Sequence, residues 1–543
     1  MPGGGRLVVV QTKSIALTGL TGTALTIEAA LSNQLPGLAI IGLPDTAIAE
    51  AKQRVRVACA NSGVQLPPGF ITVNLAPADL RKQGSAFDLA IAVSCVAVSG
   101  IHLRPDFTTT VHLGELSLDG RLKRPAGLLS AVIAAQQNGF TRVVVPADCA
   151  AEAALVPGIE VVSASSLKDV ILFYQQKPGN WRVIQPGEGR WIAQPAAGSK
   201  SAAVPGEGCT ASTVSETEHE TTDEAAYNSV DIADIVGQEE AVSALAVAAA
   251  GGHNLALNGT PGVGKTLLAN ALVGVMPDLD DAAALEASSI VSLGGTALTK
   301  LVRRPPLIAP HHTASTAAII GTGHNGFVRP GAITLASHGI LFMDEAPEFA
   351  GSVLDSLRQP LETGYIEIHR ARVRATLPAK FQLVLAANPC PCGYAGIIGG
   401  VKQCECAPQQ IRRYSNKISG PLQDRIDLRV KVNSVTNSYR AKQSQTSAEM
   451  QQRVSTAQER ARKRLKNTGW TKNAQVSGAW LRATNSVIPA KDREAIDSAL
   501  TSGYITMRGY DKILRIAWTI ADLNNLEQPD KTCIAEALHL RGY

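Results

Sequence analysis

The segment at residues 259–266, GTPGVGKT, constrains the fold of this chain more than any other stretch. It follows an apolar run that predicts a buried strand (residues 255–257), and it opens into a stretch typical of a helix (residues 267–272). In that context the pattern G-x-x-x-x-G-K-[ST] turns backbone N–H groups toward phosphate at a helix N-terminus. We therefore predict that a nucleotide is bound by Gly259, Thr260, Pro261, Gly262, Val263, Gly264, Lys265 and Thr266.

A second segment completes the predicted chemistry. Lys265 would reach the β- and γ-phosphates, and the hydroxyl of Thr266 would bind Mg²⁺. Residues 340–345, ILFMDE, predict a buried parallel strand that ends in two carboxylates. Asp344 would hold Mg²⁺ and Glu345 would polarise the attacking water. A strand ending in solvated acids is a common alternative for one such motif, but two motifs in this order favour ATP hydrolysis with Mg²⁺.

The composition is that of a water-soluble globular chain. Its 543 residues are 45% hydrophobic and 18% charged, and no apolar run approaches the roughly 18 residues that span a bilayer. The first six residues, MPGGGR, lack the apolar core of a signal peptide. We therefore expect a cytoplasmic protein with no membrane partner. The net charge of +5 is too small to indicate nucleic-acid binding by itself.

Changes of composition divide the chain into four predicted units. Residues 1–176 alternate β-rich runs with alanine-rich helical stretches and predict an α/β domain. Residues 177–230 are dominated by Gly, Pro, Ser, Thr and Glu, which predicts a flexible linker. Residues 231–440 predict an α/β ATPase core with a cysteine-rich insertion at 390–406, and residues 441–543 have a helical pattern.

The cysteine-rich insertion holds four of the nine cysteines of the chain: Cys390, Cys392, Cys404 and Cys406. Two pairs of thiolates separated by a short loop can close a tetrahedral Zn²⁺ site. The C-x-C spacing is tighter than the commoner C-x₂-C, and reduced cysteines without metal are the alternative. We favour a structural zinc site, with no catalytic role because four cysteines would fill the coordination sphere.

Three further segments are candidates for substrate contact. Residues 293–338 form a long polar interval, in which we interpret His311 and His312 as part of a substrate-contacting loop rather than as metal ligands. Residues 365–374 alternate with basic side chains and predict a β-hairpin, which could be a solvated edge strand or a contact with phosphate backbones; the family resemblance given below favours the phosphate contact. Basic residues crowd residues 453–466, where a solvated helix face and a nucleic-acid contact are equally compatible with the sequence.

A last apolar run, residues 381–387, ends at Asn388, which we predict orients the water near the γ-phosphate. Together with the motifs above, the amino-acid sequence of several segments resembles that of the magnesium-chelatase-like ComM/YifB family. The resemblance extends over nearly the whole chain apart from the linker. The resemblance is carried by HHT at 311–313, PCPCG at 389–393, ISGPLQDRID at 418–427 and the turn-rich segments 42–45, 74–82 and 114–120.

The resemblance implies a hexamer-forming AAA+ ATPase with a C-terminal helical lid. Its N-terminal domain would be similar to the ribosomal-S5-like fold of the Lon protease catalytic domain. By the same resemblance Arg425 is the finger that reaches the γ-phosphate of a neighbouring subunit, and Arg515 is a second sensor of the nucleotide. Trp518 stands where the family usually has arginine. The implied function is a DNA motor that promotes branch migration or unwinding of recombination intermediates during uptake of transforming DNA.

Three other functions are less compatible with the sequence. A metal-chelatase subunit that drives Mg²⁺ insertion into a porphyrin does not need the N-terminal domain or the cysteine cluster. A nucleotide-switched scaffold without turnover does not need Glu345, Asn388 and Arg425. Proteolysis would need a Ser-Lys dyad with an activated lysine. Ser85 and Lys82 only partly match the protease loop, so we favour a structural or binding role for that domain.

Overall fold

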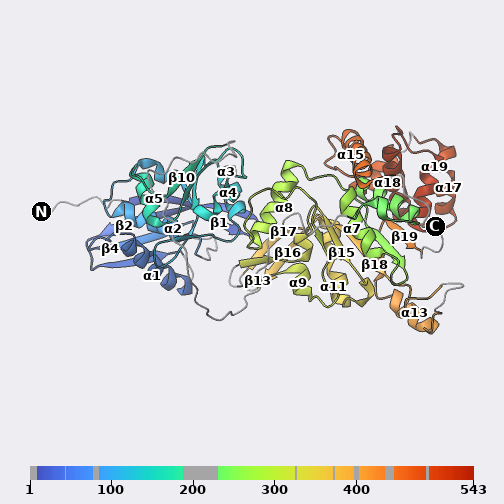
Figure 1. Cartoon of the computed structure of the whole chain (residues 1–543), viewed down its shortest axis with the longest axis horizontal. Coiled ribbons are helices and arrows are strands. Elements are labelled where there is room, and N and C mark those ends of the chain that lie inside the picture. Colours follow the sequence, from blue (N-terminus) through green and yellow to red (C-terminus); the bar gives the residue numbers. More distant parts are fainter. Residues whose placement is uncertain are drawn as a thin grey trace, which may run out of the picture.

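The computed structural model describes residues 9–42, 45–77, 85–186, 230–324, 327–370, 373–396, 403–433, 445–484 and 488–543. The molecule is elongated (Figure 1). An N-terminal domain (residues 9–186) lies at one end, a central domain (residues 230–433) in the middle and a C-terminal helical domain (residues 445–543) at the other end. Within the described part of the chain, no helix has the length and apolar character needed to cross a membrane.

One eight-stranded mixed sheet organises the N-terminal domain, in the order β10-β9-β8-β5-β1-β2-β4-β3. Because side chains alternate along a strand, Val144 enters one hydrophobic cluster while Val143 and Val145 enter another on the opposite face. Helices can therefore cover both faces of the sheet. The strands are β1 (Val9–Thr18), β2 (Thr21–Ser32), β3 (Gly37–Ile41), β4 (Phe70–Ala76), β5 (Val111–His112), β8 (Arg142–Pro146), β9 (Glu160–Ala164) and β10 (Trp181–Ile184).

The helices of this domain lie on both faces of the sheet. Helix α2 (Asp88–Val98) is apolar on nearly every side and is buried almost throughout, so it lies inside the domain. It packs against α1 (Asp45–Asn61) on one face, whereas α3 (Leu128–Gln137) covers the other. The remaining elements are α4 (Ala150–Ala153), α5 (Leu167–Tyr174), the 3₁₀ turns at Pro105–Thr108 and Ala147–Cys149, and the small hairpin of β6 (Glu115–Leu116) and β7 (Leu122–Lys123).

Strand β10 falls inside the segment that composition predicts to be a flexible linker. Its four residues pair antiparallel with β9, so the N-terminal sheet extends beyond residue 176. The strand is too short for its alternation to stand out from the Gly- and Pro-rich residues before it. Most of the predicted linker, residues 187–229, lies outside the described residues.

A five-stranded parallel sheet forms the central domain, in the order β12-β15-β18-β11-β19. Every residue of β15 (Ile340–Met343) and β18 (Gln382–Ala387) is buried, as expected for strands covered on both faces. The other strands are β11 (Leu255–Gly259), β12 (Leu307–Ile308) and β19 (Leu428–Val432). The helical elements are η3 (Ile232–Asp234), α6 (Glu239–Gly251), α7 (Lys265–Val275), α8 (Asp281–Leu293), α9 (Thr316–Ile320), α10 (Ala332–Leu335), η4 (Ala346–Glu348), α11 (Gly351–Ser356), α12 (Arg358–Thr363), α13 (Pro408–Ser415) and α14 (Gly420–Gln423).

Two antiparallel hairpins project from the central domain and contact each other. One is formed by β13 (Gly321–His324) and β14 (Phe327–Pro330), the other by β16 (Tyr365–Arg370) and β17 (Val373–Pro378). The second is the hairpin predicted from sequence, although residues 371–372 at its tip lie outside the described residues. Its apolar face, with Ile366, Ile368 and Leu377, is buried in a hydrophobic cluster of the central domain.

Five helices form the C-terminal domain. They are α15 (Ser447–Arg464), α16 (Gly478–Thr484), α17 (Ala490–Thr501), α18 (Met507–Leu523) and α19 (Lys531–Arg541), with a 3₁₀ turn at Asn473–Gln475. Helix α15 begins with a capping box, in which Thr446 accepts from the backbone N–H of Glu449 and Glu449 accepts from that of Thr446. Its buried face and those of α18 and α19 share one hydrophobic cluster with α6 and α7, so this domain packs firmly on the central domain.

Two of the basic residues predicted at 453–466 stabilise this helical packing. Arg464 donates to both carboxylate oxygens of Asp522, each at 2.6 Å, and its guanidinium lies 4.3 Å from the ring centroid of Trp518. Arg460 donates to the backbone carbonyl of Leu526. The sequence interpretation left this group open between a solvated face and a nucleic-acid contact. The side chains that stay exposed for either role are those of Arg453, Arg462, Lys463 and Lys466.

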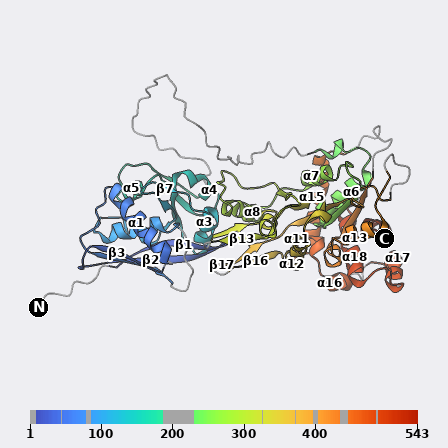
Figure 2. The same cartoon turned by 90° about the horizontal axis from the view of Figure 1, so that it is seen from below.

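The N-terminal and central domains share an interface built from α3, α8 and the β1–β2 hairpin. Leu285 and Leu298 of the central domain pack against an N-terminal hydrophobic cluster. Leu20, at the turn between β1 and β2, packs in return against the cluster that contains Leu377 of β17. In Figure 2 the β1–β2 ribbon accordingly runs toward hairpins β13–β14 and β16–β17.

Candidate nucleotide-binding and hydrolysis site

The phosphate loop, residues 259–266, joins the end of β11 to the start of α7. Gly262 and Gly264 have φ angles of +79° and +90°, in the left-handed region that L side chains rarely adopt. These two glycines turn the backbone in front of the α7 N-terminus, where free N–H groups and the helix dipole favour an anion. The predicted order of strand, glycine loop and helix is therefore present.

Lys265 is the first residue of α7, and its side chain points back into the loop. Its Nζ donates to the carbonyls of Gly259 at 2.7 Å and Thr260 at 2.9 Å, and to Oδ1 of Asn388 at 2.9 Å. Burial lowers the pKa of Lys265, while the charge of Asp344 opposes that shift. The structure thus brings the predicted lysine and the predicted sensor asparagine into direct contact.

The order of strands explains why three separate motifs converge. Strand β18 lies between β15 and β11, so Asp344, Asn388 and the phosphate loop follow the carboxyl ends of three adjacent parallel strands. Thr266 Oγ1 donates to Oδ2 of Asp344 at 2.9 Å, and Oδ1 of the same carboxylate accepts from the backbone N–H of Glu345 at 2.9 Å. A hydroxyl and a carboxylate held together are oxygen donors of the kind that Mg²⁺ prefers, so these residues fit that ion.

Glu345 has a left-handed backbone, with φ of +51° and ψ of +44°. Such a conformation is uncommon outside glycine and is frequent at functional sites. Oε2 of its carboxylate lies 3.4 Å from Nδ1 of His312, on the loop that follows β12. The adjacent ring of His311 lies against that of His312, with centroids 4.1 Å apart. Sequence reasoning missed this contact, because the adjacency of β12 and β15 is not visible in the local pattern.

Arg425 and Arg515 lie apart from these groups. Arg425 donates to the carbonyl of Pro421 at 2.6 Å and forms an ion pair with Glu362, and Arg515 donates to the carbonyl of Val476 at 2.7 Å. Both arginines line a cavity of about 1410 Å³ between the three domains. Within the described part of the chain, that cavity is lined by neither the phosphate loop nor the carboxylates that follow β15.

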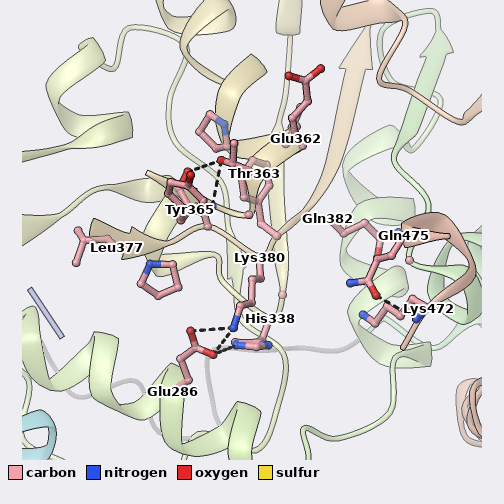
Figure 3. A pocket seen from close by; sticks show the side chains of 18 of the residues that line it. Glu286, His338, Glu362, Thr363, Tyr365, Leu377, Lys380, Gln382, Lys472 and Gln475 are labelled. Atoms are coloured by element: carbon pink, nitrogen blue, oxygen red, sulfur yellow. Dashed lines mark hydrogen bonds and ion pairs between the residues drawn. The ribbon is translucent and has the colours of Figure 1, made fainter. Parts of the chain in front are cut away.

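The walls of this cavity come from all three domains (Figure 3). Lys380 and His338 converge on Glu286 at one wall, with shortest contacts of 2.8 Å each, while Lys472 and Gln475 of the C-terminal domain lie at another. Burial opposes ionisation of Glu286, yet hydrogen bonds from His338 and Lys380 lower its pKa to about 2. The cavity is thus lined by paired charges of both signs, with Arg425 and Arg515 at its edge.

The four clustered cysteines come together as the spacing predicts. Their sulfur atoms all lie within 4.8 Å of one another. Sγ of Cys390 is 3.2 Å from that of Cys392 and 3.7 Å from that of Cys404, and the last two are 3.6 Å apart. A tetrahedron with Zn–S bonds of about 2.3 Å has edges of about 3.8 Å, so the set fits zinc.

The electrostatics of these thiols agree with that fit. Backbone N–H of Tyr394 and the thiol of Cys390 donate to the sulfur of Cys392 and lower its pKa to about 6. The N–H of Cys406 favours the thiolate of Cys404, but burial and the neighbouring sulfurs outweigh it and raise the pKa of Cys404 to about 12. A cation held by the four sulfurs would favour their thiolate forms.

Of the two residues weighed above as a protease dyad and judged unfavourable, the structure describes only Ser85. Ser85 opens the turn before α2, where its carbonyl accepts from the N–H of Asp88 at 3.1 Å, and Lys82 lies outside the described residues. Asp88 is buried and paired with Arg54 at 2.7 Å. Burial raises the pKa of Asp88 to about 6 although Arg54 opposes the shift. These contacts belong to the packing of α1 against α2.

A parallel sheet with a phosphate loop after β11, an acidic pair after β15 and a polar sensor after β18 defines an AAA+ P-loop ATPase. Family models agree with this class. Residues 231–440 match magnesium chelatase subunit ChlI, residues 27–149 match subunit ChlI of Mg-chelatase, and residues 444–541 match the ChlI C-terminal domain.

Relatives cover nearly the whole chain. Competence protein ComM of Haemophilus influenzae is 36% identical over 97% of this chain and 96% of its own length. YifB of Salmonella typhimurium, an uncharacterized protein, is 35% identical over 99% and 97%, and an uncharacterized protein of Mycobacterium tuberculosis is 40% identical over 97% of both. Lon protease of Acinetobacter baumannii is 29% identical over 34% of this chain. The chain belongs to the magnesium-chelatase-like ComM/YifB family.

Proposed function

We propose that this chain is a cytoplasmic ATPase that works as a DNA motor, promoting branch migration or unwinding of recombination intermediates. The observation that carries the enzymatic part is the convergence of Lys265, Asp344, Glu345 and Asn388 at one edge of the central sheet. A binding protein without turnover needs the phosphate loop, but it does not need a carboxylate pair and a polar sensor at the same edge.

Each residue of this edge has a distinct role in the proposal. Lys265 neutralises charge on the β- and γ-phosphates, and Thr266 with Asp344 holds Mg²⁺. The ion, held by these two residues, would supply positive charge that stabilises the charge developing during transfer. Glu345 accepts the proton of the attacking water, and Asn388 orients that water while its amide oxygen holds the ammonium of Lys265.

The position of the two arginines supports self-assembly as part of the proposal. Arg425 and Arg515 line one cavity, and the phosphate loop of their own chain is not among the residues that line it. An arginine stabilises the transferring phosphoryl group only when it lies against it. We therefore infer that both arginines serve the nucleotide of a neighbouring copy, which makes hydrolysis depend on a ring, with a hexamer as the expected form.

DNA as the substrate has two supports. One relative over the full length is named a competence protein. In addition, hairpin β16–β17 and the exposed face of α15 carry basic side chains suited to a phosphate backbone. The loop with His311 and His312 would then connect the substrate to Glu345, which His312 contacts.

The deciding experiment measures the ATPase rate with and without a branched DNA junction, at two salt concentrations. Strong stimulation that weakens with salt is expected, because contacts with phosphates release counterions. Glu345→Gln, which should retain ATP binding, gives the ATPase rate without the proposed water activation. Lys265→Ala gives the ATPase rate without bound nucleotide. Basal turnover without stimulation would refute DNA as the substrate while leaving the ATPase assignment intact.

A chelatase motor is the second candidate, because all three matching family models describe magnesium chelatase. Such a motor would drive Mg²⁺ insertion into a porphyrin together with other subunits. The same assay tests it when porphyrin and Mg²⁺ replace the DNA junction. The sheet of the N-terminal domain and the cysteine cluster have no evident task in that reaction, so we rank it below the DNA motor.

We also propose that Cys390, Cys392, Cys404 and Cys406 hold a structural Zn²⁺. The ion would fix the ends of an insertion that has little hydrophobic core of its own and would have no open coordination position for catalysis. Elemental analysis of the purified chain should find one zinc per subunit. Reduced cysteines without zinc, in protein purified in the absence of chelators, would refute the metal site.

A further inference from the structure

The turn that carries the first two cysteines lies directly on the phosphate loop. Residues 390–393 form a turn in which the N–H of Gly393 donates to the carbonyl of Cys390 at 3.0 Å. Gly393 has φ of +85°, and a Cβ built on it would lie 2.5 Å from Cδ and 2.6 Å from Cγ of Pro261. Real Cβ atoms essentially never approach other atoms so closely, so this backbone contact leaves no room for a side chain.

The same segment also reaches the phosphate loop from its other end. Asn388 precedes Cys390 by two residues and accepts from Nζ of Lys265 at 2.9 Å. Cys390, between the two contacts, is fully buried, and its sulfur accepts from the N–H of Ala395 at 3.3 Å. Six residues, 388–393, therefore contact the phosphate loop at its lysine and at its proline, and they supply two of the four clustered sulfurs.

We propose that the cysteine cluster and the phosphate loop are energetically coupled, so that Zn²⁺ bound by the cysteines raises the affinity of the chain for ATP. The inference rests on the proposed ATP site and the proposed zinc site, and it adds a link between them. Four sulfurs fixed on one ion hold turn 390–393 in one conformation, against Pro261. Without the ion, turn 390–393 and the phosphate loop must become ordered when the nucleotide binds. The entropy lost in that ordering reduces the affinity for ATP.

Thermodynamic reciprocity gives the proposal a second, independent readout. If zinc raises ATP affinity by some factor, ATP must raise zinc affinity by the same factor. A coupling of ordinary size changes each affinity on the order of tenfold. A cluster that only anchors its own insertion would bind zinc with the same affinity whether or not ATP is present.

The experiment uses the full-length chain and measures binding rather than turnover. A fluorescent ATP analogue with Mg²⁺ is titrated into zinc-loaded protein and into protein stripped with a zinc-selective chelator. Zinc affinity is measured by competition with a chromophoric chelator, with and without saturating ATP. We expect both affinities to change about tenfold and by equal factors. Equal nucleotide affinity in the loaded and stripped chains would overturn the coupling.

Two glycine variants separate coupling from loss of the fold. Gly393→Ala places a methyl group against Pro261 and should weaken ATP binding of the zinc-loaded chain while zinc stays bound. Gly396→Ala is the matched control, since Gly396 has a similar φ of +79° but, among the described residues, no atom that would contact a Cβ placed there within 4 Å. Equal ATP affinity in the two variants would overturn the proposal.

The outcomes distinguish this inference from those on which it depends. A chain that binds no zinc would refute the metal site and the coupling together. The nucleotide site would still be tested by comparing the ATP affinity of that chain with the ATP affinity of Lys265→Ala. A chain that binds zinc and not ATP would refute the nucleotide site. Zinc and ATP that bind with no mutual effect would refute only the coupling.

Discussion

Arg124 holds the N-terminal domain against the central domain, and its removal is the sharpest structural test. Its Nε and Nη2 each donate to the carboxylate of Glu152 at 2.9 Å. Nη1 donates to the carbonyl of Gly295 at 3.0 Å, and Nη2 to that of Thr296 at 3.0 Å and to the hydroxyl of Ser292 at 3.2 Å. One guanidinium thus joins a buried acid of the first domain to the C-terminal end of α8 in the second.

The expected cost of Arg124→Ala is set by the burial of Glu152. The side chain of Glu152 is 1% exposed, and among the described residues Arg124 is the one cation in ion-pair distance of it. Removing one partner of a buried pair and leaving the other charge typically costs about 3–5 kcal/mol. Loss of a cation at the negative end of α8 adds about 0.5–1 kcal/mol. The double variant Arg124→Ala, Glu152→Gln should lose less than the single one, because no charge is left unpaired.

Hydrogen exchange followed by mass spectrometry suits this test, because a chain with several domains need not unfold in one step. Amides of α3 and of the last turn of α8 should exchange roughly 10²- to 10⁴-fold faster in Arg124→Ala. Arg121→Ala is the control: its pair with Asp119 is largely exposed, and it should change exchange little. The reasoning is refuted if Arg124→Ala behaves like Arg121→Ala, or if the double variant is as damaged as the single one.

Three further perturbations address the central domain. Glu345→Gln should bind ATP but hydrolyse it on the order of 10²-fold more slowly, and normal turnover would assign water activation to another group. Arg425→Ala should leave ATP binding intact and abolish the rise of specific ATPase activity with protein concentration, whereas an unchanged rise would assign the finger elsewhere. Because His338 and Lys380 lower the pKa of Glu286 from 4.5 to about 2, its ionisation stabilises the fold above pH 4.5, and this contribution is lost as the pH falls toward 2. Thermal unfolding should therefore show Glu286→Gln destabilised by about 1–2 kcal/mol at pH 7, with the difference from the unsubstituted chain shrinking progressively below pH 4.5; a difference that is as large near pH 2 as at pH 7 would contradict the assignment.

Local motifs allowed much of the central site to be predicted. The phosphate loop, the acidic pair after β15 and Asn388 after β18 each combine a continuous apolar run with a polar end, a pattern that parallel strands impose on neighbouring residues. Their convergence could be expected because parallel strands end at the same edge. Strand β10 escaped prediction because four residues are too few for a reliable period.

Contacts between distant segments could not be read from the sequence. His312 meets Glu345 because β12 pairs with β15, and Gly393 meets Pro261 because the turn after β18 folds back over the loop after β11. In both pairs, the local sequence around each residue gives no sign of its distant partner. Arg464 is a similar case, since its role depends on the acid and the aromatic ring that α18 presents to α15.

One buried ion pair helps to fix the position of Arg515 relative to Arg425. Lys512 of α18 donates to Oδ1 of Asp427 at 3.0 Å and to the carbonyl of Ile426 at 3.1 Å. Although burial opposes ionisation of Asp427, His253 and Lys512 hold its pKa below the usual range. The segment that carries Arg425 is thereby fixed to the helix that carries Arg515, one turn from Lys512. Because buried ion pairs break at high cost, we expect the two arginines to move together if nucleotide binding displaces the C-terminal helices.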